Sequence, residues 1–105
     1  MLPVEKAELE EAFASDEAER VCNAMVATAF YEQDWRWAQD KCVSFFLGDN
    51  YQYIGLAATC LGHIARVLKT LEKDKIIDIL TSRIGDEQFA GIIEDAIDDI
   101  KMFVK

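Results

Sequence analysis

The apolar residues of this chain recur every three or four positions along almost its whole length, and few residues interrupt the pattern. The only proline is Pro3, and five glycines are spread over 105 residues. The sequence holds no sustained alternation of apolar and polar residues, which would mark a strand. Because an α-helix turns once in about 3.6 residues, this periodicity predicts an all-α fold.

Polar and glycine-containing turns divide the pattern into six expected helices. Ser15 and Asp16 are expected to cap the second helix and Asp34 the third, because short oxygen-bearing side chains satisfy the free N–H groups of a helix start. Turns are predicted at 48–50 and 85–86. The expected helices cover approximately residues 4–13, 16–32, 35–46, 51–68, 73–84 and 87–103.

Two of these helices have a broad apolar side. The fourth is apolar on most of its surface, so it is expected to lie at the centre of the fold. The second is expected to turn its whole apolar stripe toward the core. That stripe consists of Val21, Cys22, Met25, Val26, Ala29 and Phe30.

The turns indicate an internal repeat. Leu47-Gly48-Asp49 precedes one long helix and Ile84-Gly85-Asp86 precedes another 37 residues later, and the helices themselves align best at an offset of 36. Six helices then form three antiparallel pairs in one domain over 1–105, with repeats at approximately 4–33, 34–71 and 72–105. An irregular six-helix bundle is the alternative.

The fourth helix carries a family resemblance. It reads Asp49-x-x-x-Tyr53-Ile54-x-x-Ala57-Ala58-x-Cys60-Leu61-Gly62-x-Ile64, which resembles the inner-helix pattern of HEAT-like repeats. Ile54 and Ala90 stand where that pattern has arginine, so the aspartate–arginine ladder of the family is not expected here. The resemblance implies a short HEAT-like α-solenoid of three helix pairs.

Three further blocks, at 34–42, 55–66 and 95–103, resemble small bacterial HEAT-like proteins. Some of these are similar to immunity proteins encoded beside polymorphic or contact-dependent growth-inhibition toxins. The resemblance implies a protein partner, a cognate toxin domain, bound in a one-to-one complex by a monomer.

The charge narrows the possible partners. Twenty acidic and 11 basic side chains give a net charge of -9, which repels both nucleic-acid phosphates and anionic lipid. The charge is uneven, because the three repeats carry -6, +1 and -4. No apolar run approaches a membrane span, and the first residues lack the pattern of a signal peptide, so a cytoplasmic location is expected.

The last helix carries a cluster of four carboxylates, Glu94, Asp95, Asp98 and Asp99, with only Lys101 nearby. Their spacing places them along one side of the helix. The repeat offset matches Asp95 to Thr59 and Asp99 to His63, which are outward positions on inner helices. Inner helices line the concave face of solenoids, so these six residues are candidates for partner binding. A merely solvated face is the alternative.

Aromatic residues form a second candidate surface. Trp35 and Trp37 are two positions apart and cannot share one helix face, and Tyr51 and Tyr53 raise the same question. Trp35 and Tyr53 are expected in the core, which leaves Trp37 and Tyr51 more exposed. Tryptophan and tyrosine are enriched at interface hot spots, so these two are added to the partner-binding candidates.

No residues are predicted to act in catalysis or to bind a metal or cofactor. His63 is the only histidine, and the three cysteines lack short chelating pairs. Cys22, Cys42 and Cys60 are expected to be small buried apolar residues. A DNA glycosylase built on HEAT-like repeats would need a large basic groove, which the charge argues against.

The sequence therefore predicts a protein that is not an enzyme. The expected function is an immunity protein that neutralises a basic toxin domain, a nuclease, by blocking its active-site cleft. The alternative is a HEAT-like adaptor or scaffold for a partner that is not a toxin.

Overall fold

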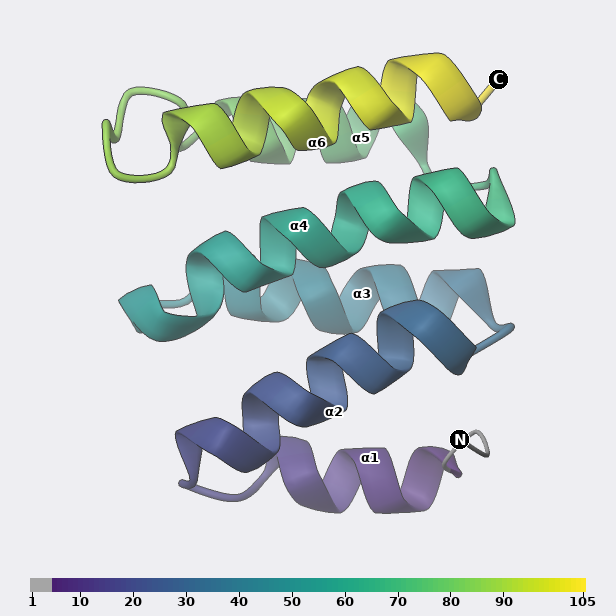
Figure 1. Cartoon of the computed structure of the whole chain (residues 1–105), viewed down its shortest axis with the longest axis vertical. Helices are drawn as coiled ribbons and strands as arrows, with labels where there is room; N and C mark the ends of the chain where they lie inside the picture. The colour runs from purple at the N-terminus through teal and green to yellow at the C-terminus, as the bar shows by residue number, and fades with distance from the viewer. Residues whose placement is uncertain (1–4) are drawn as a thin grey trace.

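The computed structural model describes residues 5–105, which form six α-helices and no strand. They are α1 (Lys6–Phe13), α2 (Ala18–Tyr31), α3 (Trp35–Phe46), α4 (Tyr51–Leu68), α5 (Lys73–Thr81) and α6 (Ala90–Phe103). In Figure 1, α2, α4 and α6 lie side by side in one layer, which we call the inner layer, with α3 and α5 behind them. Helix α1 closes one end of the stack against α2. The all-α prediction is confirmed. The order of stacking agrees with a short HEAT-like α-solenoid, which stays a prediction.

Helix starts follow the sequence in two places. The Asp34 side chain accepts a hydrogen bond of 3.2 Å from the backbone N–H of Trp37 at the start of α3. The Asn50 side chain accepts one of 2.9 Å from the backbone N–H of Gln52 at the start of α4. The first helix was expected from Val4, which lies outside the described residues. The limits of the three repeats remain a prediction.

The predicted cap of α2 is wrong. Its N-cap is Glu17, which makes no capping hydrogen bond through its side chain. The Ser15 hydroxyl donates instead to the carbonyl of Ala12 at the end of α1, 2.7 Å away. With this hydroxyl used by the preceding helix, α2 begins two residues later than expected.

The turn between α5 and α6 is longer than predicted. Helix α5 ends at Thr81 instead of residue 84, and α6 begins at Ala90 instead of residue 87. Near the end of α5, the hydroxyls of Thr81 and Ser82 donate to backbone carbonyls three or four residues earlier. Such bonds compete with the hydrogen-bond ladder of a helix and favour its termination.

Helix α4 is central, as predicted, and packs against α2, α3 and α6. Its fully buried residues include Ile54, Ala57, Ala58, Leu61, Ile64 and Ala65. The prediction for α2 is wrong in part: Val21, Met25 and Ala29 are buried, but Val26 is 38% exposed and Phe30 is 53% exposed. Cys42 and Cys60 are buried as expected, and Cys22 is half-buried.

Polar contacts join the helices that lie behind the inner layer. Gln39 of α3 is fully buried and makes two hydrogen bonds to Glu72, the N-cap residue of α5. Its Nε2 donates to the Glu72 carboxylate and its Oε1 accepts from the Glu72 N–H, each at 2.8 Å. Arg36 reaches the same carboxylate at 3.0 Å. The second and third helix pairs are thus tied by hydrogen bonds as well as by the apolar core.

Candidate protein-binding face

The four carboxylates of α6 lie on the surface. Glu94, Asp95 and Asp98 are exposed, and Asp99 is half-buried. Asp95 and Asp99 also line a small cleft of about 130 Å³ between α4 and α6, which Thr59 shares from the α4 side. The structure therefore brings together Thr59 and the carboxylates that the repeat offset assigned to one face.

The two helices approach closely at Gly62. A Cβ atom there would lie 3.2 Å from the Cα of Ala96 and 3.1 Å from a carboxylate oxygen of Asp99. Both distances are shorter than ordinary van der Waals contact. The absence of a side chain at this position is thus what lets α6 present its carboxylates beside α4.

Arg66 was not among the residues predicted for this face. Its Nε lies 3.8 Å from a carboxylate oxygen of Asp99. The expectation that only Lys101 lies near the acidic cluster is therefore wrong. The ion pair joins α4 to α6, and residue spacing within α6 alone could not reveal it. Glu94, Asp95 and Asp98 form no ion pair with any residue from 5 to 105.

His63 connects this cleft with α2. Its ring packs on the ring of Phe30 with centroids 3.9 Å apart, and Arg66 approaches its Nδ1 at 3.4 Å. Partial burial lowers the pKa of His63, the Arg66 guanidinium lowers it further, and Asp99 opposes both effects. The imidazole is consequently neutral at pH 7. Phe30, His63, Arg66 and Asp99 thus form a continuous row across α2, α4 and α6.

The two predicted aromatic residues lie elsewhere. Trp37 is half-buried on α3, where its ring centroid lies 6.4 Å from that of Phe13 in α1 and where Lys6 and Lys41 lie over it. Trp37 therefore belongs to the contact between α1 and α3 and not to the carboxylate face. Tyr51 is 57% exposed and packs edge-on against Phe89 at the entry to α6.

The expectation that Trp35 is a core residue is wrong. Its side chain is only half-buried and lies beneath the guanidinium of Arg36, 4.8 Å from the ring centroid. Tyr53 is also half-buried but packs edge-on against Phe45 at the margin of the core.

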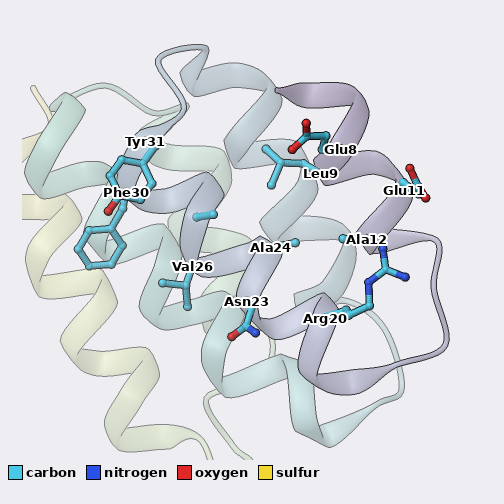
Figure 2. A pocket seen from close by; sticks show the side chains of 11 residues that line it. Glu8, Leu9, Glu11, Ala12, Arg20, Asn23, Ala24, Val26, Phe30 and Tyr31 are labelled. Atoms are coloured by element: carbon cyan, nitrogen blue, oxygen red, sulfur yellow. The ribbon is translucent and has the colours of Figure 1, made fainter. Parts of the chain in front are cut away.

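Sequence reasoning missed a groove between α1 and α2. It has a volume of about 880 Å³, and its apolar residues include Leu9, Ala24, Val26 and Phe30. In Figure 2, Phe30 and Tyr31 lie at one end and Arg20 at the other, with Glu8 and Glu11 on the α1 side. One signal was present in the sequence. Cys22, Val26 and Phe30 form a second apolar row beside the row of Val21, Met25 and Ala29. The apolar stripe of this helix is therefore wider than contact with one neighbouring layer of helices can cover.

Two other kinds of site are absent from the described part of the chain. No three His, Cys, Asp or Glu side chains in residues 5–105 are grouped as a metal ion would need. Within the same range, no helix combines the length and apolarity required to cross a bilayer.

Comparison with solved structures gives a match over nearly the whole chain. The chain superimposes on a chain from the crystal structure of a CDI complex from Cupriavidus taiwanensis with a TM-score of 0.86. The two are 32% identical in sequence, and the match covers 98% of this chain and 95% of that one. No protein-family model matches the sequence, and neither does any curated protein.

Proposed function

Because this chain belongs to the same family as the chain it matches in the Cupriavidus taiwanensis CDI complex, we propose that it is an immunity protein of a contact-dependent growth inhibition (CDI) system. It binds the toxin domain of that system in the bacterial cytoplasm and neutralises it. The whole-chain match at 32% identity is the observation that carries the proposal.

The surface chemistry supports a basic partner. The chain carries a net charge of -9, and three carboxylates of α6 are exposed without an ion-pair partner among residues 5–105. Opposite charge on the partner would accelerate encounter and orient the two surfaces. A nuclease domain is cationic where it holds the phosphates of its substrate, so an acidic inhibitor can bind the same cationic surface and block the active-site cleft. We therefore propose that the toxin is a nuclease.

Growth rescue is the direct test. The cognate toxin domain is expressed in bacteria with and without the chain, and growth is followed. Rescue accompanied by a stable one-to-one complex supports immunity. Binding without rescue favours the adaptor alternative, and the absence of both binding and rescue contradicts the proposal.

The role of α6 is tested by charge removal. Replacing Asp95, Asp98 and Asp99 by Asn is expected to slow association with an inactive toxin domain by about 3- to 10-fold at low salt and to flatten its salt dependence. Stopped-flow fluorescence at several ionic strengths measures both quantities.

A matched control removes the same charge from the other layer. Asp40, Asp74 and Asp78 are exposed on α3 and α5, and their replacement by Asn changes the net charge equally. This triple variant is expected to slow association far less. Equal effects of the two triple variants would show that only net charge matters and that α6 is not the contact face.

A further inference from the structure

The groove between α1 and α2 is an apolar surface that the fold itself leaves uncovered. Val26 is 38% exposed and Phe30 is 53% exposed, although both lie on a helix whose other apolar row is buried. Leu9 and Ala24 form the floor and are nearly inaccessible to solvent. Exposed apolar residues gathered in one groove, rather than scattered singly, mark an interaction site.

The charge around the groove selects a cationic occupant. Glu8 and Glu11 line its α1 side and form no ion pair with any described residue. Its one basic residue is Arg20, whose Nη1 lies 3.6 Å from a carboxylate oxygen of Glu17, the N-cap residue of α2. The surrounding segment, residues 1–33, holds eight acidic and two basic side chains. A second copy of this chain would bring another acidic surface, so the charge disfavours self-association through this groove.

The shape of the groove favours a helix. It follows α2 from Arg20 to Tyr31, which corresponds to roughly 17 Å or three helical turns. The described residues contain no strand whose edge a partner could extend. An amphipathic helix fits such a groove by inserting apolar side chains at positions i, i+4 and i+7.

The groove is also continuous with the carboxylate face. Phe30 lies at one end of the groove and stacks on His63, which leads through Arg66 to Asp99. A single partner can therefore cover both surfaces from one side of the molecule.

We propose that the α1–α2 groove docks a cationic amphipathic helix of the toxin domain. Apolar side chains of that helix contact Val26 and Phe30, and its lysines or arginines face Glu8 and Glu11. This inference rests on the proposed function for the identity of the partner. The groove contacts supply slow dissociation, whereas the carboxylates of α6 supply fast association.

The test uses an inactive form of the cognate toxin domain, with binding measured by biolayer interferometry. Val26→Asp is expected to weaken binding at least tenfold, mainly through faster dissociation. Val67→Asp is the matched control, because Val67 is 50% exposed and lies outside the groove. It is expected to change the affinity less than about twofold. Thermal melts of both variants verify that the fold is intact.

The outcomes separate the two proposals. If the wild-type chain does not bind the toxin domain, the proposed function fails, and this inference fails with it. If the wild-type chain binds and the two variants lose affinity equally, only the groove assignment fails.

A photo-crosslinker identifies the occupant. With p-benzoylphenylalanine at position 26, irradiation of the complex is expected to label a helical, lysine- or arginine-bearing segment of the toxin domain. Labelling of a second copy of this chain, of an acidic or extended toxin segment, or of no toxin residue overturns the proposal.

Discussion

The buried amide of Gln39 provides the sharpest test of how the helix pairs are joined. Glu72, the N-cap residue of α5, makes no capping hydrogen bond of its own, and its N–H is satisfied by Oε1 of Gln39 from another helix. The same amide donates through Nε2 to the carboxylate. We predict that Gln39→Leu destabilises the fold by removing both hydrogen bonds to Glu72, together with the one that Nε2 donates to Asp40 within α3, while nearly preserving side-chain volume.

The magnitude follows from the two bonds. A hydrogen bond in a folded protein contributes about 1 kcal/mol, and the lost acceptor acts as a helix cap, whose removal costs about 1–2 kcal/mol. The more apolar leucine recovers part of this loss through burial. We therefore expect Gln39→Leu to lower the free energy of unfolding by about 2 kcal/mol. For a domain of this length that corresponds to a fall in Tm of about 8–10 °C.

Urea denaturation followed by circular dichroism at 222 nm measures this free energy. Gln52→Leu is the matched control, because Gln52 is exposed on α4, and we expect a change within about 0.5 kcal/mol. If the Gln39 and Gln52 variants unfold at the same urea concentration, the buried amide does not stabilise the joint between the helix pairs. The reasoning from its hydrogen bonds is then refuted.

Three further predictions concern pH, packing and thiol chemistry. The hydrogen bond from Gln39 is the main cause that lowers the pKa of Glu72 below its ordinary value of 4.5. The ionised Glu72 carboxylate therefore stabilises the fold above that pH, and this stabilisation is lost as pH falls through the pKa of the folded state. The difference in unfolding free energy between wild type and Gln39→Leu should therefore shrink in urea titrations below pH 4.5. Gly62→Ala should lower the free energy of unfolding by about 1 kcal/mol, because the added methyl group overpacks against α6. Gly91→Ala should raise it by about 0.5 kcal/mol in the same assay, because a Cβ at that position meets nothing within 4 Å and alanine favours a helix. Burial raises the pKa of the Cys22 thiol, so the native protein should react with a disulfide reagent at pH 7 more slowly than the unfolded chain, and equally fast labelling of the two would contradict this.

Periodicity predicted the helices because it depends on local geometry alone. The fourth helix was placed correctly from Tyr51 to Leu68, since Asn50 caps its start and apolar residues continue on most of its sides. The cap of α2 could not be predicted in this way. Ser15 lies between two helices, and the helix that its hydroxyl serves depends on the local backbone around it.

The candidate face was predictable in part. The repeat offset matched Thr59 to Asp95 and His63 to Asp99. These positions lie near one another in the structure because α4 and α6 are neighbours in one layer (Figure 1). The pairing of Arg66 with Asp99 depends on how far each helix is rotated about its axis, which an alignment of positions does not specify. The groove was missed for a related reason. Apolar width predicts burial, but it does not tell whether a neighbouring helix or a partner covers the second row of α2.

The uneven charge of the three repeats now has a structural explanation. The middle segment, residues 34–71, has a charge of +1, and three of its four basic residues pair with carboxylates of the neighbouring segments. Lys41 of α3 pairs with Glu10 of α1, and Arg36 of α3 pairs with Glu72 at the start of α5. Two of the three pairs therefore lie between α1, α3 and the start of α5, behind the inner layer, and the third joins α4 to α6 within it.

The inner layer has far less internal neutralisation. Among residues 5–105, the one ion pair that joins inner-layer helices is Arg66 to Asp99, and the other carboxylates of α6 face solvent unpaired. Exposed ion pairs contribute little to stability, so this asymmetry has small value for folding. The unpaired carboxylates of α6 contribute instead to the electrostatic potential in front of the inner layer, and charges of this kind steer a cationic partner. Under the proposed function, the unpaired carboxylates of α6 therefore favour the approach of a basic toxin domain to the inner layer.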